Sequence, residues 1–157
     1  PALGIHVGTA SVRPASMADG EDMHAWRNDP AVRAVSRQSA DIPLDRHLAW
    51  LAAALEDPSR TILIGEIGTR TIGVVRFDRE QDAAEVSIYL DPRINALGLG
   101  TRLLAAAERF LAGQPDAPAT LLAQTLAGND ASSRLFVALG YQYADGYFRK
   151  PLRAGDC

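Results

Sequence analysis

The chain has 157 residues, and its 16 lysines and arginines against 19 aspartates and glutamates give a formal net charge of −3. The two signs are interspersed, which argues against nucleic acid as a partner. No segment approaches the roughly 18 consecutive apolar residues of a membrane-spanning helix, so we expect a cytoplasmic protein with no membrane contact. The single cysteine, Cys157, excludes a disulfide within the chain, and we expect no bound metal. One domain is expected over residues 1–157, with loose termini at 1–8 and 153–157.

The first part of the chain predicts a strand followed by two helical segments. Residues 9–14 are expected to form the strand. Ser16 is a candidate N-cap for a helix that carries Met23 and Trp26. The segment 28–30 contains a proline and ends this helix. A short helical turn is then expected over residues 31–36.

An amphipathic helix and a β-hairpin are predicted next. Pro43 suits the start of a helix, and four leucines after it share one apolar face: Leu44, Leu48, Leu51 and Leu55. A second Asp-Pro pair, at 57–58, closes this helix. Strands are predicted at 61–67 and 71–77, because the Gly-Thr-Arg segment between them is typical of a hairpin.

The segment 84–104 is the one around which the rest is organised. Residues 85–90 are rich in β-branched and aromatic side chains, as a half-buried strand needs, and Asp91-Pro92 ends that strand. Gly98 and Gly100 follow. A helix is predicted from apolar residues at helical spacing: Leu99, Leu103, Leu104, Ala107, Phe110 and Leu111. A strand, a glycine turn and a helix N-terminus favour an anion site, because unpaired N–H groups point outward there.

Two common phosphate motifs fail at this turn. A dinucleotide fingerprint requires a third glycine at the position of Leu103. A Walker loop requires a lysine after its last glycine, where this chain has Thr101 and Arg102. A tight turn without a ligand is therefore the alternative interpretation. The remaining chain predicts a loop at 113–118, a strand, a helix and two closing strands, at 119–125, 129–139, 141–147 and 148–152.

A second segment bears on the interpretation of this glycine turn. It is Gly-Asn-Asp-Ala-Ser-Ser-Arg-Leu-Phe-Val-Ala-Leu-Gly-Tyr at 128–141. Together the two segments resemble the acetyl-CoA-binding core of the GNAT N-acetyltransferases, over roughly residues 12–152. That superfamily carries Arg/Gln-x-x-Gly-x-Gly/Ala after its fourth strand, where this chain has Asn-Ala-Leu-Gly-Leu-Gly at 95–100. It also carries an asparagine at the start of a later helix that ends in Gly-Phe or Gly-Tyr. Here these residues are Asn129, Gly140 and Tyr141.

Further strings look like one branch, the N-acetyltransferase of the pseudaminic acid pathway and its relatives. They are Val-Arg-Pro-Ala at 12–15, Trp-Arg-Asn-Asp-Pro-Ala-Val-Arg at 26–33, His-x-x-Trp-Leu at 47–51, Gly-Val-Val-Arg-Phe-Asp at 73–78 and Ala-Glu-Val-Ser-Ile at 84–88. That branch acetylates an amino group on a UDP-linked deoxyamino sugar, and in some bacteria a similar domain is fused behind a sugar-nucleotide hydrolase. The resemblance implies a small-molecule acceptor amine and leaves open a homodimer and an upstream fused domain.

The resemblance also implies an α+β fold, with a mixed, mostly antiparallel central sheet and helices on both faces. In the family, the fourth and fifth strands splay apart and the pantetheine of acetyl-CoA lies between them, where unpaired strand-edge groups can hydrogen-bond it. The implied cofactor-binding residues lie on the strand, in the turn and on the later helix: Ile88, Tyr89, Leu90, Asn95, Ala96, Leu97, Gly98, Leu99, Gly100, Thr101, Asn129, Ser132 and Phe136. Since Asn95 replaces the usual arginine or glutamine, Arg93 and Arg102 are candidates for positive charge near the pyrophosphate, or ordinary surface arginines.

Acetyl transfer to an amine needs a base, because the amine is mostly protonated at neutral pH. Glu85, at the start of the organising strand, is the first candidate, and a solvated strand-end carboxylate is the alternative. His47 is the second candidate, and a core or sugar-contacting histidine is its alternative. In the superfamily the leaving thiolate takes its proton from a tyrosine where this chain has Phe136. Ser132 lies on the same helical stripe and is the substitute candidate acid, unless it only packs.

The acceptor-binding candidates are Trp26, Arg27, Asn28, His47 and Arg76. An aromatic face suits a nucleobase or sugar, and arginine suits a diphosphate; core packing is the alternative for Trp26. The leading hypothesis is an acetyl-CoA-dependent N-acetyltransferase acting on a nucleotide-linked amino sugar. The alternatives are acetylation of a protein N-terminus, as in ribosomal-protein acetyltransferases, and a non-catalytic acyl-CoA-binding module.

Overall fold

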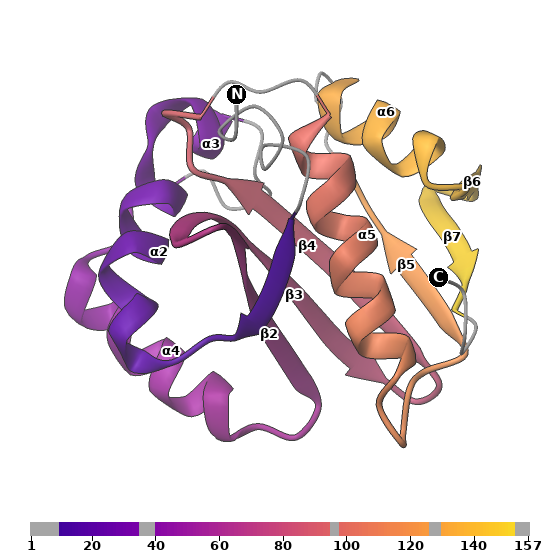
Figure 1. Cartoon of the computed structure of the whole chain (residues 1–157), viewed down its shortest axis with the longest axis horizontal. Coiled ribbons are helices and arrows are strands. Elements are labelled where there is room, and N and C mark those ends of the chain that lie inside the picture. Colours follow the sequence, from indigo (N-terminus) through magenta and orange to yellow (C-terminus); the bar gives the residue numbers. More distant parts are fainter. Residues whose placement is uncertain (1–9, 35–39, 95–97, 126–129, 153–157) are drawn as a thin grey trace.

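A computed structural model describes residues 10–34, 40–94, 98–125 and 130–152. Within these ranges the chain forms one seven-stranded sheet in the order β1-β2-β3-β4-β5-β7-β6 (Figure 1). The strands are β1 Ser11–Pro14, β2 Arg60–Ile67, β3 Arg70–Glu80, β4 Ala83–Leu90, β5 Thr120–Ala123, β6 Gln142–Ala144 and β7 Tyr147–Pro151. All neighbours are antiparallel except β4 and β5, which are parallel. The predicted mixed, mostly antiparallel sheet is confirmed.

Helices cover both faces of the sheet, as predicted. A 3₁₀ turn and five α-helices occur in the described ranges: η1 Met17–Asp19, α2 Gly20–Asn28, α3 Pro30–Ala34, α4 Leu44–Glu56, α5 Leu99–Ala112 and α6 Asp130–Ala138. On one face α5 and α6 pack against the strands through a large apolar cluster. On the other face α2 and α4 pack through a smaller one. The sheet therefore separates two cores, and the buried side chains of its central strands point to one or the other.

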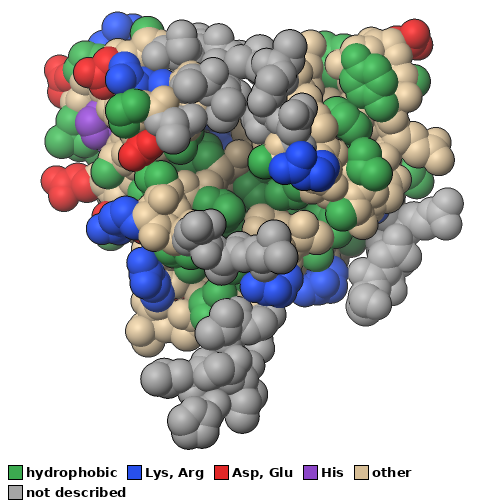
Figure 2. All heavy atoms as spheres, turned by 90° about the horizontal axis from the view of Figure 1, so that it is seen from above, with side chains coloured by type: hydrophobic (Ala, Val, Ile, Leu, Met, Phe, Trp, Pro, Cys, Tyr) green, Lys and Arg blue, Asp and Glu red, His purple; other side chains and the backbone are tan. Residues whose placement is uncertain are grey.

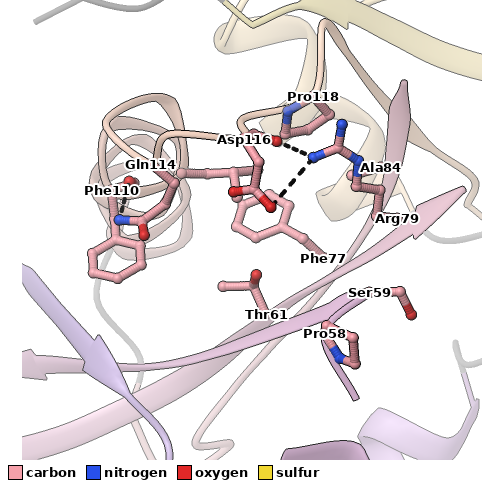
Figure 3. Close-up of a pocket in the computed structure, with 11 residues that line it drawn as sticks. Pro58, Ser59, Thr61, Phe77, Arg79, Ala84, Phe110, Gln114, Asp116 and Pro118 are labelled. Atoms are coloured by element: carbon pink, nitrogen blue, oxygen red, sulfur yellow. Dashed lines mark hydrogen bonds and ion pairs between the residues drawn. The ribbon is translucent and has the colours of Figure 1, made fainter. Parts of the chain in front are cut away.

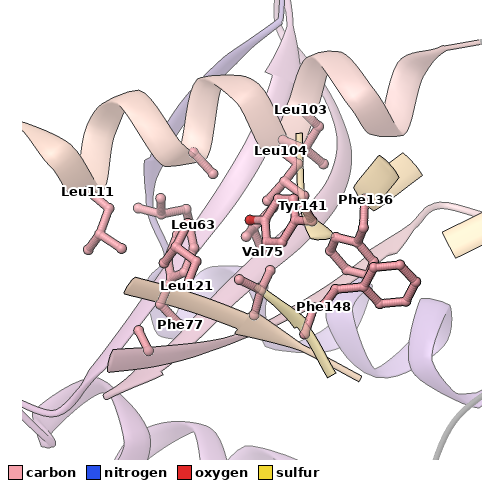
Figure 4. Packing of buried hydrophobic residues seen from close by; sticks show 14 residues of the cluster. Leu63, Val75, Phe77, Leu103, Leu104, Leu111, Leu121, Phe136, Tyr141 and Phe148 are labelled. Atoms are coloured by element: carbon pink, nitrogen blue, oxygen red, sulfur yellow. The ribbon is translucent and has the colours of Figure 1, made fainter. Parts of the chain in front are cut away.

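The larger core lies between α5 and the middle of the sheet (Figure 4). Alternate residues of the central strands point into it, among them Val75 and Phe77 of β3 and Ala84 and Val86 of β4. At its α6 end the ring of Phe136 lies 5.0 Å from that of Tyr141 and 5.6 Å from that of Phe148. Aromatic pairs at such distances add to the stabilisation from area burial.

The apolar stripe of α4 differs from the predicted one. The buried side chains are His47, Leu51 and Ala54, at helical spacings of four and three, whereas Leu44 remains 38% exposed. Leu44 lies in the first turn, beyond the end of the stripe that faces the sheet. Sequence periodicity located the helix correctly, but a histidine occupies the buried position at its start.

Three predicted boundaries were wrong for local reasons. Strand β3 extends to Glu80 and β4 begins at Ala83, because the charged residues at 78–80 continue the ladder, with Asp78 and Arg79 held in ion pairs and Glu80 exposed. At the C-terminal end, Asp145 and Gly146 both have positive φ, 54° and 86°, and they form the turn between β6 and β7. An Asp-Gly pair is a strong hairpin signal, and here it ends β6 three residues before the predicted boundary.

Glu108, Tyr141 and Lys150 form a hydrogen-bonded group that connects α5 to the C-terminal part of the sheet. Glu108 of α5 accepts hydrogen bonds from the Tyr141 hydroxyl at 2.7 Å and from Lys150 Nζ at 2.6 Å. The Glu108 side chain is 8% exposed and that of Lys150 23%. Burial and the neighbouring Glu108 carboxylate raise the pKa of the Tyr141 phenol, so the phenol stays protonated and donates.

Glu108→Ala should therefore lower the free energy of unfolding by about 2–4 kcal/mol, because it removes the shared hydrogen-bond acceptor of Tyr141 and Lys150. Tyr141→Phe is the matched control: it removes one hydrogen bond and should cost about 1 kcal/mol. Denaturant unfolding of the two variants measures both values. Equal losses would contradict the joint role of the carboxylate.

Candidate functional site

The parallel pairing of β4 with β5 is short. Three residue pairs are formed, from Ala83 opposite Thr120 to Glu85 opposite Leu122, although β4 continues to Leu90 in its ladder with β3. The two strands lie together at their beginnings and separate toward the top of Figure 1. From Val86 to Leu90 the β5 side of β4 therefore has no ladder partner within the described residues. An unpaired strand edge offers backbone hydrogen bonds to an extended ligand.

Gly98 and Gly100 lie at the start of α5 and have different structural roles. Gly98 has φ +76° as the N-cap of α5, a left-handed conformation that other residues rarely adopt. Gly100 lies under α6, where an added Cβ would come within 2.7 Å of Leu135 Cδ1. Gly98 therefore shapes the turn, and Gly100 allows α6 to approach α5. Leu99 is 1% exposed, and Thr101 is half-buried in the first turn.

The two arginines expected near this turn differ in their surroundings. Arg93 forms an ion pair with the buried Asp91 at 2.7 Å and also donates its backbone N–H to that carboxylate. This pairing, above all the side-chain hydrogen bonds, lowers the pKa of Asp91. Arg102 instead extends back along α5, with Nη1 3.7 Å from the Cβ position of Gly98. Its Nε is buried without a hydrogen-bond partner among the described residues. Arg93 therefore has a structural partner, and Arg102 lies at the helix N-terminus.

Glu85 lies at the point where β4 and β5 separate, on the sheet face that carries α2 and α4. Ala84 and Val86 point into the α5 core, so Glu85, Ser87 and Tyr89 point to the opposite face. On that face Asp78 of β3 is directly across from Glu85, and Arg76 is across from Ser87. The structure thus places Glu85 beside an arginine–carboxylate pair and at the end of the strand separation.

Trp50 of α4 covers this group, although it was not a predicted site residue. The guanidinium of Arg76 lies 5.3 Å from the Trp50 ring centroid and that of Arg60 lies 5.9 Å from it. Arg76 also donates to Asp78 through Nε at 3.0 Å. Cation–π contacts of this kind fix the arginine side chains. Trp50 was visible in the sequence only as part of the His-x-x-Trp-Leu string.

Two of the predicted acceptor-binding residues have structural roles. Trp26 is 3% exposed within the smaller core, so packing accounts for it. Asn28 exchanges two hydrogen bonds with the backbone of Ile42, at 2.8 and 3.0 Å. His24 Nε2 lies 2.6 Å from the same carbonyl. Asn28 and His24 therefore hold the chain before α4 against α2.

His47 is buried between α2 and α4, with 5% of its surface exposed. Its ring lies 5.5 Å from that of His24 and 5.7 Å from that of Trp50. Burial lowers the pKa of His47, and His24 and Arg27 lower it further. Its Nε2 has no hydrogen-bond partner among the described residues. The structure thus makes His47 a neutral imidazole at neutral pH.

On α6, Ser132 is half-buried in the first turns and Phe136 lies in the aromatic group of the larger core. Ile88 and Leu90 direct their side chains to that core, and both lie in the part of β4 beyond its ladder with β5. The expected positions Asn95, Ala96, Leu97 and Asn129 lie outside the described residues. Within the described ranges no group of three potential metal-ligating side chains occurs, and no helix is long and apolar enough to cross a membrane.

The separated ends of β4 and β5 and the first turn of α5 open to one end of the molecule. Figure 2 shows this end, with a hollow whose floor is formed by hydrophobic side chains. A second hollow of about 130 Å³ lies at the opposite end of α5. Phe77, Thr61 and Phe110 line it, and Arg79 closes it by bonding to Asp116 (Figure 3). None of the sequence-predicted site residues borders this second hollow.

Comparison with known proteins identifies the arrangement. The family model described as acetyltransferase (GNAT) domain matches residues 11–142. No curated protein matches the chain significantly. The solved structure of yncA from Salmonella typhimurium, with its cofactor acetyl-CoA, is 20% identical, with a TM-score of 0.74 over 94% of this chain and 96% of that one.

Two further solved structures have the same fold at lower identity. The spermidine N-acetyltransferase of Vibrio cholerae, in complex with CoA and spermine, is 13% identical, with a TM-score of 0.79 over 91% of this chain and 95% of that one. A ribosomal alpha-N-protein acetyltransferase in complex with coenzyme A is 14% identical, with a TM-score of 0.77 over 93% and 96%.

Because the folded-state pKa of His47 lies below the reference value of 6.5, protonation favours the unfolded chain. Stability should be full above pH 6.5 and should fall as the pH drops from there through the lowered pKa, with a slope of at most about 1.4 kcal/mol per pH unit. His47→Phe should flatten this dependence in denaturant titrations. Asp19, Asp57 and Asp91 also have lowered pKa values, but their contribution is lost only as the pH falls toward and below the reference value of 3.8, at which these carboxyls titrate in the unfolded chain. An unchanged slope in His47→Phe would contradict the assignment.

Proposed function

The chain belongs to the GNAT family of acetyltransferases, and on that premise we propose that it transfers the acetyl group of acetyl-CoA to an amine held on the α2/α4 face of the sheet. The observation that carries the proposal is the separation of β4 from β5 immediately after Glu85. The Glu85 carboxylate therefore lies next to the start of the unpaired edge of β4. A thioester lying along that edge would present its carbonyl to an amine beside Glu85.

The pantetheine arm would lie along the β5 side of β4. Ile88 and Leu90 supply its proposed backbone partners, because the backbone groups of Tyr89, which alternate with theirs, face β3. An amide of pantetheine can take the place of a missing strand neighbour there. The fit to an extended ligand is supported by the length of the open edge, which spans Val86 to Leu90.

The pyrophosphate would lie at the N-terminus of α5. Gly98 turns the backbone so that the first N–H groups of the helix point outward, and a 14-residue helix adds positive potential at that end. Arg102 reaches the same turn with a buried Nε that makes no hydrogen bond among the described residues. We propose that Arg102 supplies charge that the usual arginine or glutamine would give at Asn95.

Catalysis would depend on Glu85 as the base that accepts a proton from the acceptor amine, directly or through water. Proximity of thioester and amine supplies much of the rate, and a positioned base supplies a further part. His47 is neutral, as a base must be, but it is buried between α2 and α4. Its position supports a role in fixing those helices more than a role in proton transfer.

The acceptor we propose is an amine on a nucleotide-linked amino sugar. Trp50, Arg60 and Arg76 present an aromatic face and two cations beside Glu85, which suits a sugar and a phosphate. Acetylation of a protein N-terminus is the alternative. A non-catalytic acyl-CoA-binding module would bind CoA without acetylating any amine, and thiol release in the presence of an amine panel separates the two cases.

Thr101→Glu tests the cofactor site. A carboxylate in the first turn of α5 stabilises the helix but repels a phosphate, so the variant should stay folded and bind acetyl-CoA about tenfold more weakly or worse, a loss of about 1.4 kcal/mol or more. Thr101→Gln, which adds a similar volume without charge, should bind nearly as well as the parent. Calorimetry that finds equal affinity in all three proteins would remove the α5 N-terminus from the site.

Glu85→Gln tests the base. It keeps the shape but removes the basic group, and turnover should fall on the order of 10²-fold or more. The loss should shrink as the pH rises, because more of the acceptor amine is then already neutral. Glu80→Gln, the same chemical change at an exposed position of β3, is the matched control and should leave turnover near that of the parent. A loss that stays constant from about pH 6 to about pH 10, roughly the span between the histidine and lysine reference values, would mean that Glu85 only holds the substrate.

A further inference from the structure

Arg27 interacts electrostatically with three groups from other elements, the like charges of Arg33 and Arg76 and the phenol of Tyr89. Arg27 lies in the last turn of α2, Arg33 lies on α3, and Arg76 lies on β3. Arg76 is opposite Ser87, two residues before Tyr89 on the same strand face. Tyr89 packs on the smaller core beside Trp26, the residue before Arg27. We call Arg27, Arg33, Arg76 and Tyr89 the arginine cluster.

The members of the arginine cluster act on one another electrostatically. Burial lowers the pKa of Arg27, and the like charges of Arg33 and Arg76 lower it further. Burial raises the pKa of the Tyr89 phenol to about 12, against the opposing effect of Arg76 and Arg27. Gathered like charges in a partly buried place repel one another. A bound anion would relieve that repulsion.

Hydrogen-bonding capacity remains within the cluster. Arg33 Nε is shielded from solvent and has no hydrogen-bond partner among the described residues. Arg76 uses Nε for Asp78, and its guanidinium is held over Trp50. A planar guanidinium fixed in this way is arranged for bidentate bonding to a phosphate.

The cluster lies at a definite distance from the reaction point. Tyr89 is four residues beyond Glu85 on the same face, roughly 13 Å along the strand, and Arg76 is opposite the residue midway between them. If the amine of the acceptor lies at Glu85, the part of the acceptor that reaches the arginines is therefore one or two sugar-ring widths away from that amine. A polyamine, the ligand type of the Vibrio cholerae structure, would meet like charge there.

We propose that the arginine cluster is an anion subsite that holds a phosphate or diphosphate group of the acceptor while its amine lies at Glu85. This inference rests on the proposed acetyltransferase function and adds the charge of the acceptor and the residues that recognise it. Arg33 is a specificity residue that the sequence analysis contained only as the last residue of the string at 26–33.

The first experiment is calorimetric titration of inorganic pyrophosphate into protein saturated with CoA, so that the α5 N-terminus is already filled. Pyrophosphate should bind the parent protein, and Arg33→Gln and Arg76→Gln should each weaken binding about tenfold or more, as expected for a lost charge-assisted contact. Arg109→Gln, an exposed arginine on α5 far from the cluster, is the matched control and should bind like the parent. Thermal unfolding checks that each variant is folded.

The second experiment compares acetylation of a UDP-linked amino sugar with that of the same free amino sugar. Arg33→Gln should raise KM for the UDP-linked acceptor about tenfold and leave kcat/KM for the free sugar unchanged. Pyrophosphate binding that depends on Arg33 without acetylation of any amine would support the subsite and refute the transferase. Acetylation without pyrophosphate binding, or with equal binding in all variants, would overturn the subsite and leave the transferase standing.

Discussion

The structure depends on where β4 and β5 stop pairing. Their parallel ladder ends at Glu85 and Leu122, because β5 is four residues long and is held on its other side by β7. β4 meanwhile follows β3 to Leu90. The separation leaves backbone groups of β4 without ladder partners among the described residues and places Glu85 at the end of the ladder. A longer β5–β4 ladder would close the edge and remove the site.

The fold could be predicted because its signals are local and periodic. Leu103, Leu104 and Leu111 recur at helical spacing and are buried in α5 as expected, and the hairpin signal at Gly68 marks the β2–β3 turn, with φ +62°. The predictions failed where a polar side chain is buried or where charged residues belong to a strand. His47 occupies a buried position on α4 that an apolar pattern cannot reveal, and charged residues at 78–80 continue a strand that composition assigns to a loop.

The site was less predictable because its contacts join segments that are distant in sequence. Trp50, Arg60 and Arg76 come from a helix and two strands, and no spacing rule connects them. Asn28 looked like an acceptor contact because it is polar and lies in a family string, yet its amide holds the backbone of Ile42. Arg33 gained significance only when the structure showed its charge acting on Arg27 of α2. Glu85 could be predicted as a candidate base because strand position and side-chain chemistry coincide in one short segment.

Phe136 lies where the family resemblance implies a tyrosine that protonates the leaving thiolate. Without that acid, deprotonation of the acceptor amine becomes the more demanding step. Phe136 packs against Tyr141 and Phe148, and the hydroxyl of Tyr141 is already bonded to Glu108. A thiol has a reference pKa of about 8.5, so a thiolate is a tolerable leaving group near neutrality and can take its proton from water after departure. An alkylamine with a reference pKa of about 10.4 is almost fully protonated at the same pH. Removing that proton is then the harder step. In the mechanism that we propose, this step depends on Glu85, and the nearby cations favour the neutral amine by opposing its charge.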